Sequence, residues 1–222
     1  MFIIEDRLLD KSEDQVKCLL NYPVIKLINN ENGFVEYINR KIYEDVLCFK
    51  DVVEQILKEE DINSVVNLMT EYTISFNKNN IISIPIEFSQ FIELYNINYI
   101  NSYNYDFNEE KEIKLRDIFD ELIDYKTFIG NMVKIQLAMM LDNNEEIGIS
   151  NYDLINMIYN IEIYEDQAFY LEEDGLVICL SSYEMGSNIR KILEFKIMYE
   201  DAKYYFSDYF LRGVISESTT TL

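Results

Sequence analysis

Residues 33–58 read GFVEYINRKIYEDVLCFKDVVEQILK, and this stretch decides the fold more than any other. Apolar residues recur in it every three or four positions, which is the period of a helix with one buried face. We therefore predict a long amphipathic helix that packs through its apolar stripe on the rest of the protein. The stripe consists of Val35, Ile38, Ile42, Val46, Phe49, Val53 and Ile56.

The chain on either side of this helix reads as strands. Residues 16–28, before it, are largely apolar, and Pro23 disfavours a helical conformation at the residue that precedes it. After the helix, residues 65–77 and 81–92 alternate apolar and polar side chains, at least in part, as strands do. Residues 94–107 are rich in tyrosine and asparagine, and their alternation predicts a further strand with an aromatic face.

Helices dominate the next part of the chain. Residues 117–141 have a helical pattern in two pieces, and Asp124 is the predicted N-cap of the second. Ser150 and Asp153 have the spacing of a capping box, which predicts a short helix through Tyr159.

The clearest hairpin spans residues 167–183. Its turn reads EEDG, and the glycine readily supplies the positive φ that many hairpin turns need. We predict a last strand at 193–199 and a short aromatic helix at 201–211, which Gly213 ends.

These elements predict an α+β protein with a mainly antiparallel sheet, a long N-terminal helix and further helices packed on the sheet. The apolar stripe of the long helix is too extensive for one strand to cover, so the helix should pack on the later sheet. We therefore expect residues 15–213 to form a single domain, in which 15–60 supply a strand and the long helix and 65–213 supply the sheet and the other helices. Residues 1–14 are an N-terminal segment, and residues 214–222 are expected to be a disordered tail.

The charge of the chain limits its partners. Acidic residues outnumber basic ones by 41 to 19, which gives a net charge of −22 over 222 residues. Such a polyanion is repelled by nucleic acid and by anionic membrane surfaces, whereas a cationic protein is attracted to it. The alternative is that the charge only keeps the protein soluble. The acidic start resembles no secretory signal and no apolar run is long enough to span a membrane, so we expect a cytoplasmic protein.

The sequence lacks the groups of the common catalytic systems. It contains no histidine, which excludes Ser-His-Asp and Cys-His nucleophiles as well as histidine-ligated metal sites. Cys18, Cys48 and Cys179 lack the spacing of a zinc site, and we interpret Cys48 and Cys179 as buried thiols. The six glycines are far apart, so no phosphate-binding loop is present. We expect no catalytic residue, no bound metal and no cofactor.

Three segments carry a resemblance to a known family. They are YPVI at 22–25 with a helix containing YIN at 37–39, YDF at 105–107 with IKLRDIF at 113–119, and FYLEEDGLVI at 169–178 followed by Tyr183 and Glu184. Together they resemble the domain of unknown function in the extracellular part of the RsiV anti-sigma factor, over about residues 15–200. Similar domains precede the catalytic domain of PdaC-type peptidoglycan deacetylases.

The resemblance implies a binding function, because RsiV uses this non-catalytic α+β domain to bind lysozyme. Two stretches depart from the family pattern. Members usually carry a Gly-Gly-Ala-His-like loop where residues 91–101 have neither glycine nor histidine, and a glycine-rich stretch where this chain has residues 185–190. Loops on a rigid scaffold are where binding changes most easily, so we predict a contact surface at these two stretches. Its predicted residues are Tyr95, Tyr99, Tyr183 and Glu184.

Three functions stay open at this point. The first is a non-enzymatic binding or sensing module, in which Tyr95 and Tyr99 anchor a protein partner. The second is an acidic intracellular scaffold or immunity-type protein that neutralises a cationic partner. The third is a carboxylate-dependent enzyme that acts on glycans, which requires two acids about 5–10 Å apart in one cleft. Under the structural alternative, both tyrosines belong to the core.

Overall fold

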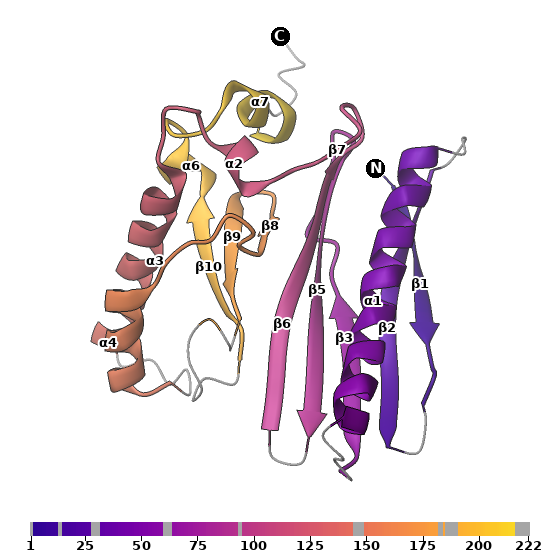
Figure 1. Ribbon diagram of the computed structural model, residues 1–222. Helices are drawn as coiled ribbons and strands as arrows, with labels where there is room; N and C mark the ends of the chain where they lie inside the picture. The colour runs from indigo at the N-terminus through magenta and orange to yellow at the C-terminus, as the bar shows by residue number, and fades with distance from the viewer. Residues whose placement is uncertain are drawn as a thin grey trace.

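The computed structural model describes residues 2–12, 15–27, 32–59, 64–92, 95–143, 149–181, 184 and 191–215. Two layered halves lie side by side (Figure 1). In the first, a long helix covers one face of a seven-stranded sheet; in the second, helices cover a three-stranded sheet. The predicted α+β class, with a mainly antiparallel sheet and a long N-terminal helix, is confirmed.

The large sheet has the strand order β1-β2-β3-β5-β6-β7, and β4 pairs with β5 off this path. Its strands are β1 (Ile3–Leu9), β2 (Val16–Lys26), β3 (Val66–Tyr72), β4 (Phe76–Lys78), β5 (Ile81–Ile92), β6 (Tyr95–Asp106) and β7 (Lys111–Glu112). Every pair in it is antiparallel except β2 with β3. A parallel pair needs a crossover connection, and α1 (Gly33–Glu59) provides it. Sequence analysis did not predict β1, which lies within the N-terminal segment 1–14.

The buried face of α1 follows the predicted stripe until its last turn. Six of the predicted positions are buried, but Ile56 is 47% exposed and Leu57 takes its place. A period of 3.6 residues turns the helix so that the position four residues after Val53, rather than three, meets the sheet. Lys50 is also buried, against expectation, because its ammonium group forms an ion pair with Glu54.

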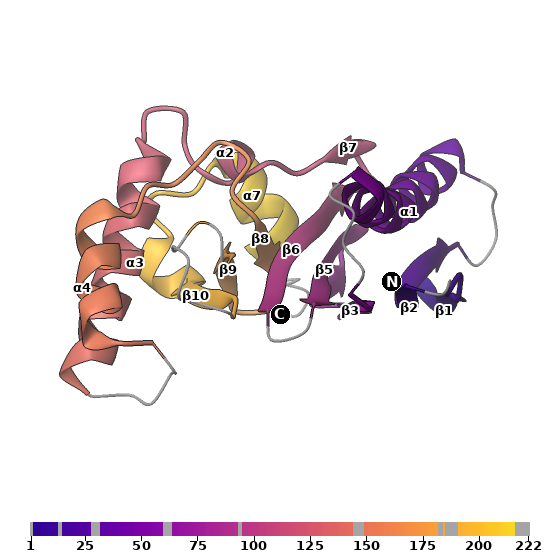
Figure 2. The ribbon, with the colours of Figure 1, turned by 60° about the horizontal axis from the view of Figure 1, so that its bottom comes forward.

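The two faces of β5 have different roles, because successive side chains of a strand point to opposite faces. Toward α1 the strand presents Ile82, Ile84, Ile86 and Phe88, which belong to the core beneath the helix. Ser83, Pro85 and Glu87 lie on the opposite face, which α1 does not cover. Figure 2 shows α1 on one side of the large sheet and the small sheet beyond β6.

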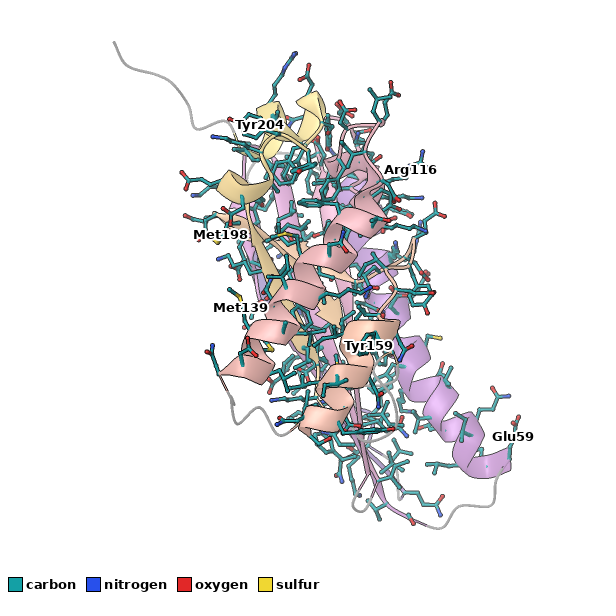
Figure 3. All side chains as sticks on the ribbon, turned by 90° about the vertical axis from the view of Figure 1, so that its left-hand side faces the viewer. Glu59, Arg116, Met139, Tyr159, Met198 and Tyr204 are labelled. Carbon is teal, nitrogen blue, oxygen red and sulfur yellow. The ribbon has the colours of Figure 1, made fainter. Side chains whose placement is uncertain are left out.

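The second half contains the small sheet and its helices. The elements are α2 (Leu115–Ile118), α3 (Tyr125–Asp142), α4 (Asn151–Asn160), β8 (Phe169–Leu171), β9 (Gly175–Leu180), β10 (Leu193–Met198), α6 (Tyr199–Ala202), α7 (Asp208–Phe210) and the π-helical turn η1 (Leu211–Ile215). Both predicted caps are confirmed: the Asp124 carboxylate accepts from Thr127 N at 3.2 Å, and Ser150 Oγ accepts from Asp153 N at 3.1 Å. The later helices α3 and α4 pack on the small sheet, which sequence analysis did not separate from the large one. Figure 3 shows the outer side of these two helices.

Three expectations about single residues are wrong. Gly213 does not end a helix, because η1 continues through it to Ile215, while residues 216–222 lie outside the described part. Cys48 is exposed on α1, whereas Cys179 is buried as expected. Gly175 does not have the positive φ of a turn glycine. It is the first residue of β9, and a Cβ atom there would lie 3.0 Å from Ile197 O and 2.8 Å from Lys196 Cε.

A buried polar network joins the two sheets. Ser83 Oγ donates to Asn104 Oδ1 at 2.6 Å, and both side chains are buried. The network continues to β8, because Leu171 N donates to Ser83 Oγ at 2.9 Å and Asn104 Nδ2 donates to Phe169 O at 2.9 Å. The position of the small sheet is therefore tied to β5 and β6 by directional hydrogen bonds.

Among the described residues, no helix has the length and apolarity needed to cross a bilayer.

Candidate functional site

The open face of the large sheet and one face of the small sheet enclose a cleft. The large sheet contributes Glu71 from β3 and Glu87 from β5, on the side opposite α1. The small sheet contributes Tyr170 from β8 and Glu194 from β10, which point away from the core under α3. Ile100 of β6 lies between the two sheets, where it packs with residues of the small sheet.

Acidic side chains dominate this cleft, which has a volume of about 640 Å³. Six carboxylates line it, and we refer to the space between them as the acidic cleft. They are Glu71, Glu87, Glu172, Glu173, Asp174 and Glu194. They come from three strands and one hairpin turn, so the acidity results from how the two sheets meet. Such a concentration of like charge favours cations inside the cleft.

Two lysines neutralise part of the hairpin turn. Lys196 Nζ lies 2.6 Å from Glu172 Oε2 and 2.5 Å from Asp174 Oδ1, so it holds both ends of the turn. The hydrogen bond from Lys196 lowers the pKa of Asp174. Lys78 Nζ lies 2.7 Å from Glu173 Oε1. Six carboxylates and two ammonium groups leave the cleft with a net charge of about −4 when all are ionised.

The surroundings of Glu194 raise its pKa. Burial raises its pKa above the ordinary value of 4.5, and the charges of Glu172 and Glu87 raise it further. Tyr170 opposes this effect by donating its hydroxyl to Glu194 Oε1 at 3.1 Å, and this bond stabilises the ionised form. Glu87 lies on the opposite wall, which the large sheet forms, and there Asn98 Nδ2 of the neighbouring strand donates to it at 3.0 Å.

We expect Glu194→Gln to stabilise the protein at pH 7 but not at pH 4. A carboxyl whose folded pKa is raised stabilises the fold below its ordinary pKa, and this contribution is lost as the pH rises through the folded pKa. Glutamine cannot ionise, and its amide oxygen can still accept the Tyr170 hydroxyl. Because Glu194 is partly exposed, we expect a gain of only about 0.5 kcal/mol in the free energy of unfolding.

Urea denaturation of both proteins at pH 4 and pH 7 measures this difference. A variant that is less stable than the parent at pH 7 would contradict the expected direction.

The structure places the four predicted contact residues differently from one another. The Tyr99 ring is partly buried on the α1 side of β6, stacked on Phe88 with centroids 5.0 Å apart. Glu184 accepts from Ser181 N at 2.6 Å and from Gln167 Nε2 at 2.9 Å, so both carboxylate oxygens are engaged. Tyr95 is the first residue of β6, and Tyr183 lies outside the described residues. Neither Tyr99 nor Glu184 lines the acidic cleft.

Sequence reasoning missed the acidic cleft, because its residues are far apart in the chain. Glu71 and Glu87 are polar positions in alternating strands, which by itself indicates only a solvated face. The three consecutive acids of the hairpin turn, Glu172 to Asp174, form a cluster in the sequence. Their sequence does not indicate which part of the protein lies opposite them. Across the described ranges, no three acidic or cysteine side chains come together closely enough to hold a metal ion.

Comparison with known proteins adds a family match. Residues 116–200 match the family model described as a protein of unknown function, DUF3298. The matched region contains the hairpin and Glu194, while Glu71 and Glu87 lie outside it. No curated protein shows a significant match to the chain.

Two solved structures resemble the whole fold. A member of the DUF3298 family from Bacteroides fragilis aligns with a TM-score of 0.55 and 18% identity, over 98% of this chain and 96% of its own. A DUF3298 family protein from Pseudomonas aeruginosa aligns with a TM-score of 0.60 and 11% identity, over 95% and 94%. At such identities the likeness concerns the fold.

Proposed function

We propose that the protein is a non-enzymatic binding module whose acidic cleft receives a cationic segment of a protein partner. The observation that carries this proposal is the acidic cleft itself, where six carboxylates from two sheets share about 640 Å³. A guanidinium or ammonium group that enters can form charge-assisted hydrogen bonds with carboxylates from both walls.

The charge of the whole chain supports the same proposal. A net charge of −22 attracts a cationic partner over long range, and the cleft supplies the short-range contacts. The resemblance to the RsiV-type domain suggests lysozyme, a cationic protein, as the first partner to test. An intracellular scaffold or immunity-type protein would use the same cleft to neutralise a cationic partner.

We expect lysozyme to bind at low salt and to be released as salt rises, because ions screen the attraction. Replacing both Glu71 and Glu173 by lysine should weaken binding by about tenfold or more at an ionic strength of about 0.05 M. These two side chains are chosen because Glu71 is exposed and the Glu173 ion pair is largely solvated.

The matched control is Asp51→Lys with Glu121→Lys, which makes the same change in net charge at exposed positions outside the cleft. Isothermal titration calorimetry of the three proteins compares their affinities. Equal losses in both double variants would mean that net charge alone drives binding, and this would contradict the role of the cleft.

One observation favours a second candidate, a carboxylate-dependent enzyme that acts on glycans. Glu194 has a raised pKa and shares a cleft with Glu87, and a proton donor beside a carboxylate base is what glycoside hydrolysis requires. Incubation with peptidoglycan or chitin, followed by an assay for new reducing ends, tests this candidate. Activity that Glu194→Gln abolishes would favour the enzyme over the binding module.

A further inference from the structure

The outer face of α3 and α4 exposes large apolar side chains. α3 packs on the small sheet through Ile129, Val133 and Leu137, so the opposite side of this helix points away from the protein. α4 packs beside it through Leu154 and Met157. Figure 3 shows both helices from the outside. The exposed apolar side chains of the two helices are Ile135, Met139, Tyr152, Ile155 and Tyr159, with exposed fractions from 41% for Ile155 to 79% for Tyr159.

These two helices carry no net charge in a strongly acidic chain. Among the 18 residues of α3, only Lys126, Lys134 and Asp142 are charged. Among the 10 residues of α4, only Asp153 is charged. The two positive and two negative charges cancel, whereas the whole chain has a net charge of −22. Two copies of the chain repel each other, and this repulsion is weakest where they approach through a face without net charge.

The charges of α3 are placed so that the helix is complementary to itself. Lys134, Ala138 and Asp142 form a row along it, because residues four apart are neighbours on a helix surface. Among the described residues, none forms an ion pair with the side chain of Lys134 or Asp142. If a two-fold axis relates two α3 helices at Ala138, the residue four before it in one copy lies opposite the residue four after it in the other. Lys134 of each copy then meets Asp142 of the other.

We propose that two copies of the protein associate through this face, with their α3 helices antiparallel about Ala138. Ile135, Ile155 and Tyr159 would lose their exposure to water, and the two reciprocal ion pairs between Lys134 and Asp142 would fix the register. Exposed apolar surface of this kind is typical of protein contact sites. The contact lies on the side of the small sheet opposite the acidic cleft and does not depend on the function proposed for that cleft.

The size of the face indicates how strong this association is. The 18 residues of α3 make it about 27 Å long, and two neighbouring helices make it about 18 Å wide. The contact therefore buries about 500 Å² of each copy, or about 1,000 Å² in all, which is near the lower limit for specific interfaces. We accordingly expect a dimer with a dissociation constant of about 10 μM.

Sedimentation equilibrium of the full chain, at an ionic strength of about 0.15 M, measures the association. Ile135→Glu should weaken the dimer at least about tenfold, because it buries a charge in the apolar part of the contact. Ile56→Glu is the matched control, since it makes the same change at an exposed position on α1, and the affinity should stay within about threefold. Circular dichroism shows whether both variants are folded.

Exchanging the two charges of the row provides a second measurement. Lys134→Asp and Asp142→Lys should each weaken the dimer by about three- to tenfold, because like charges then face each other twice. Asp142→Lys is the sharper variant, since it makes the chain less negative and would strengthen the dimer if only the overall repulsion mattered. The double variant Lys134→Asp, Asp142→Lys keeps the net charge and restores both ion pairs, so its affinity should return to within about threefold of the parent.

Three results would overturn the proposal. The first is a parent protein that stays monomeric up to about 0.3 mM. The second is an equal effect of Ile135→Glu and Ile56→Glu, and the third is a double charge variant that stays as weak as the single ones. If the parent is monomeric and Ile135→Glu instead weakens its binding to lysozyme, the face belongs to the contact with that partner and not to a second copy.

Discussion

Replacing Asn104 by alanine should lower the free energy of unfolding by about 3 kcal/mol. The Asn104 side chain accepts from Ser83 Oγ and donates to Phe169 O, and it is 2% exposed. Alanine would leave the Ser83 hydroxyl and the Phe169 carbonyl without these partners inside the protein. A buried polar group that loses its partner costs about 1–3 kcal/mol, because water does not replace the lost bond.

Urea denaturation of the parent protein and of Asn104→Ala also tests whether the two halves unfold together. We expect a single transition for the parent protein, with far-ultraviolet circular dichroism and tyrosine fluorescence changing at the same urea concentration. Asn67→Ala is the control, because Asn67 is exposed on β3, and its effect should stay within about 0.5 kcal/mol. A fragment of residues 65–213 that folds stably by itself would contradict the expected single unit.

The elements that sequence analysis predicted are those with local signals. The period of α1, the caps at Asp124 and Ser150 and the hairpin turn each depend on residues within a few positions of one another. β1 gave no such signal, because most of its side chains are exposed and it reads IIEDRLL. It becomes a strand through pairing with β2 from Ile3 to Leu9, which is a tertiary effect.

The acidic cleft could not be predicted for a related reason. Glu87 and Glu194 lie in different sheets, and the hydrogen bonds that Ser83 and Asn104 form with β8 are among the contacts that hold these sheets together. Gly175 shows the same limit. A glycine is needed at this position because β10 approaches it closely, and not because of the turn beside it. In both cases the contacts that matter are made by residues distant in the sequence.

We expect the largest loss of stability from a substitution in the core between α1 and the large sheet. Ile42→Ala should lower the free energy of unfolding by about 3.5 kcal/mol, because Ile42 is 0% exposed in the core that α1 and the large sheet share. The loss combines the buried side-chain surface with a cavity that the surrounding side chains, held between helix and sheet, fill only in part.

Ile56→Ala is the matched control, because it makes the same chemical change on the same helix. Ile56 is 47% exposed, although the sequence pattern placed it on the buried stripe. Its replacement should cost less than about 1 kcal/mol, since alanine has the higher helix propensity and little buried surface is lost. Urea denaturation of the two variants decides between the sequence pattern and the structure. Equal losses would mean that the last turn of α1 packs on the sheet through Ile56, whereas a small loss for Ile56 alone agrees with Leu57 as the buried residue.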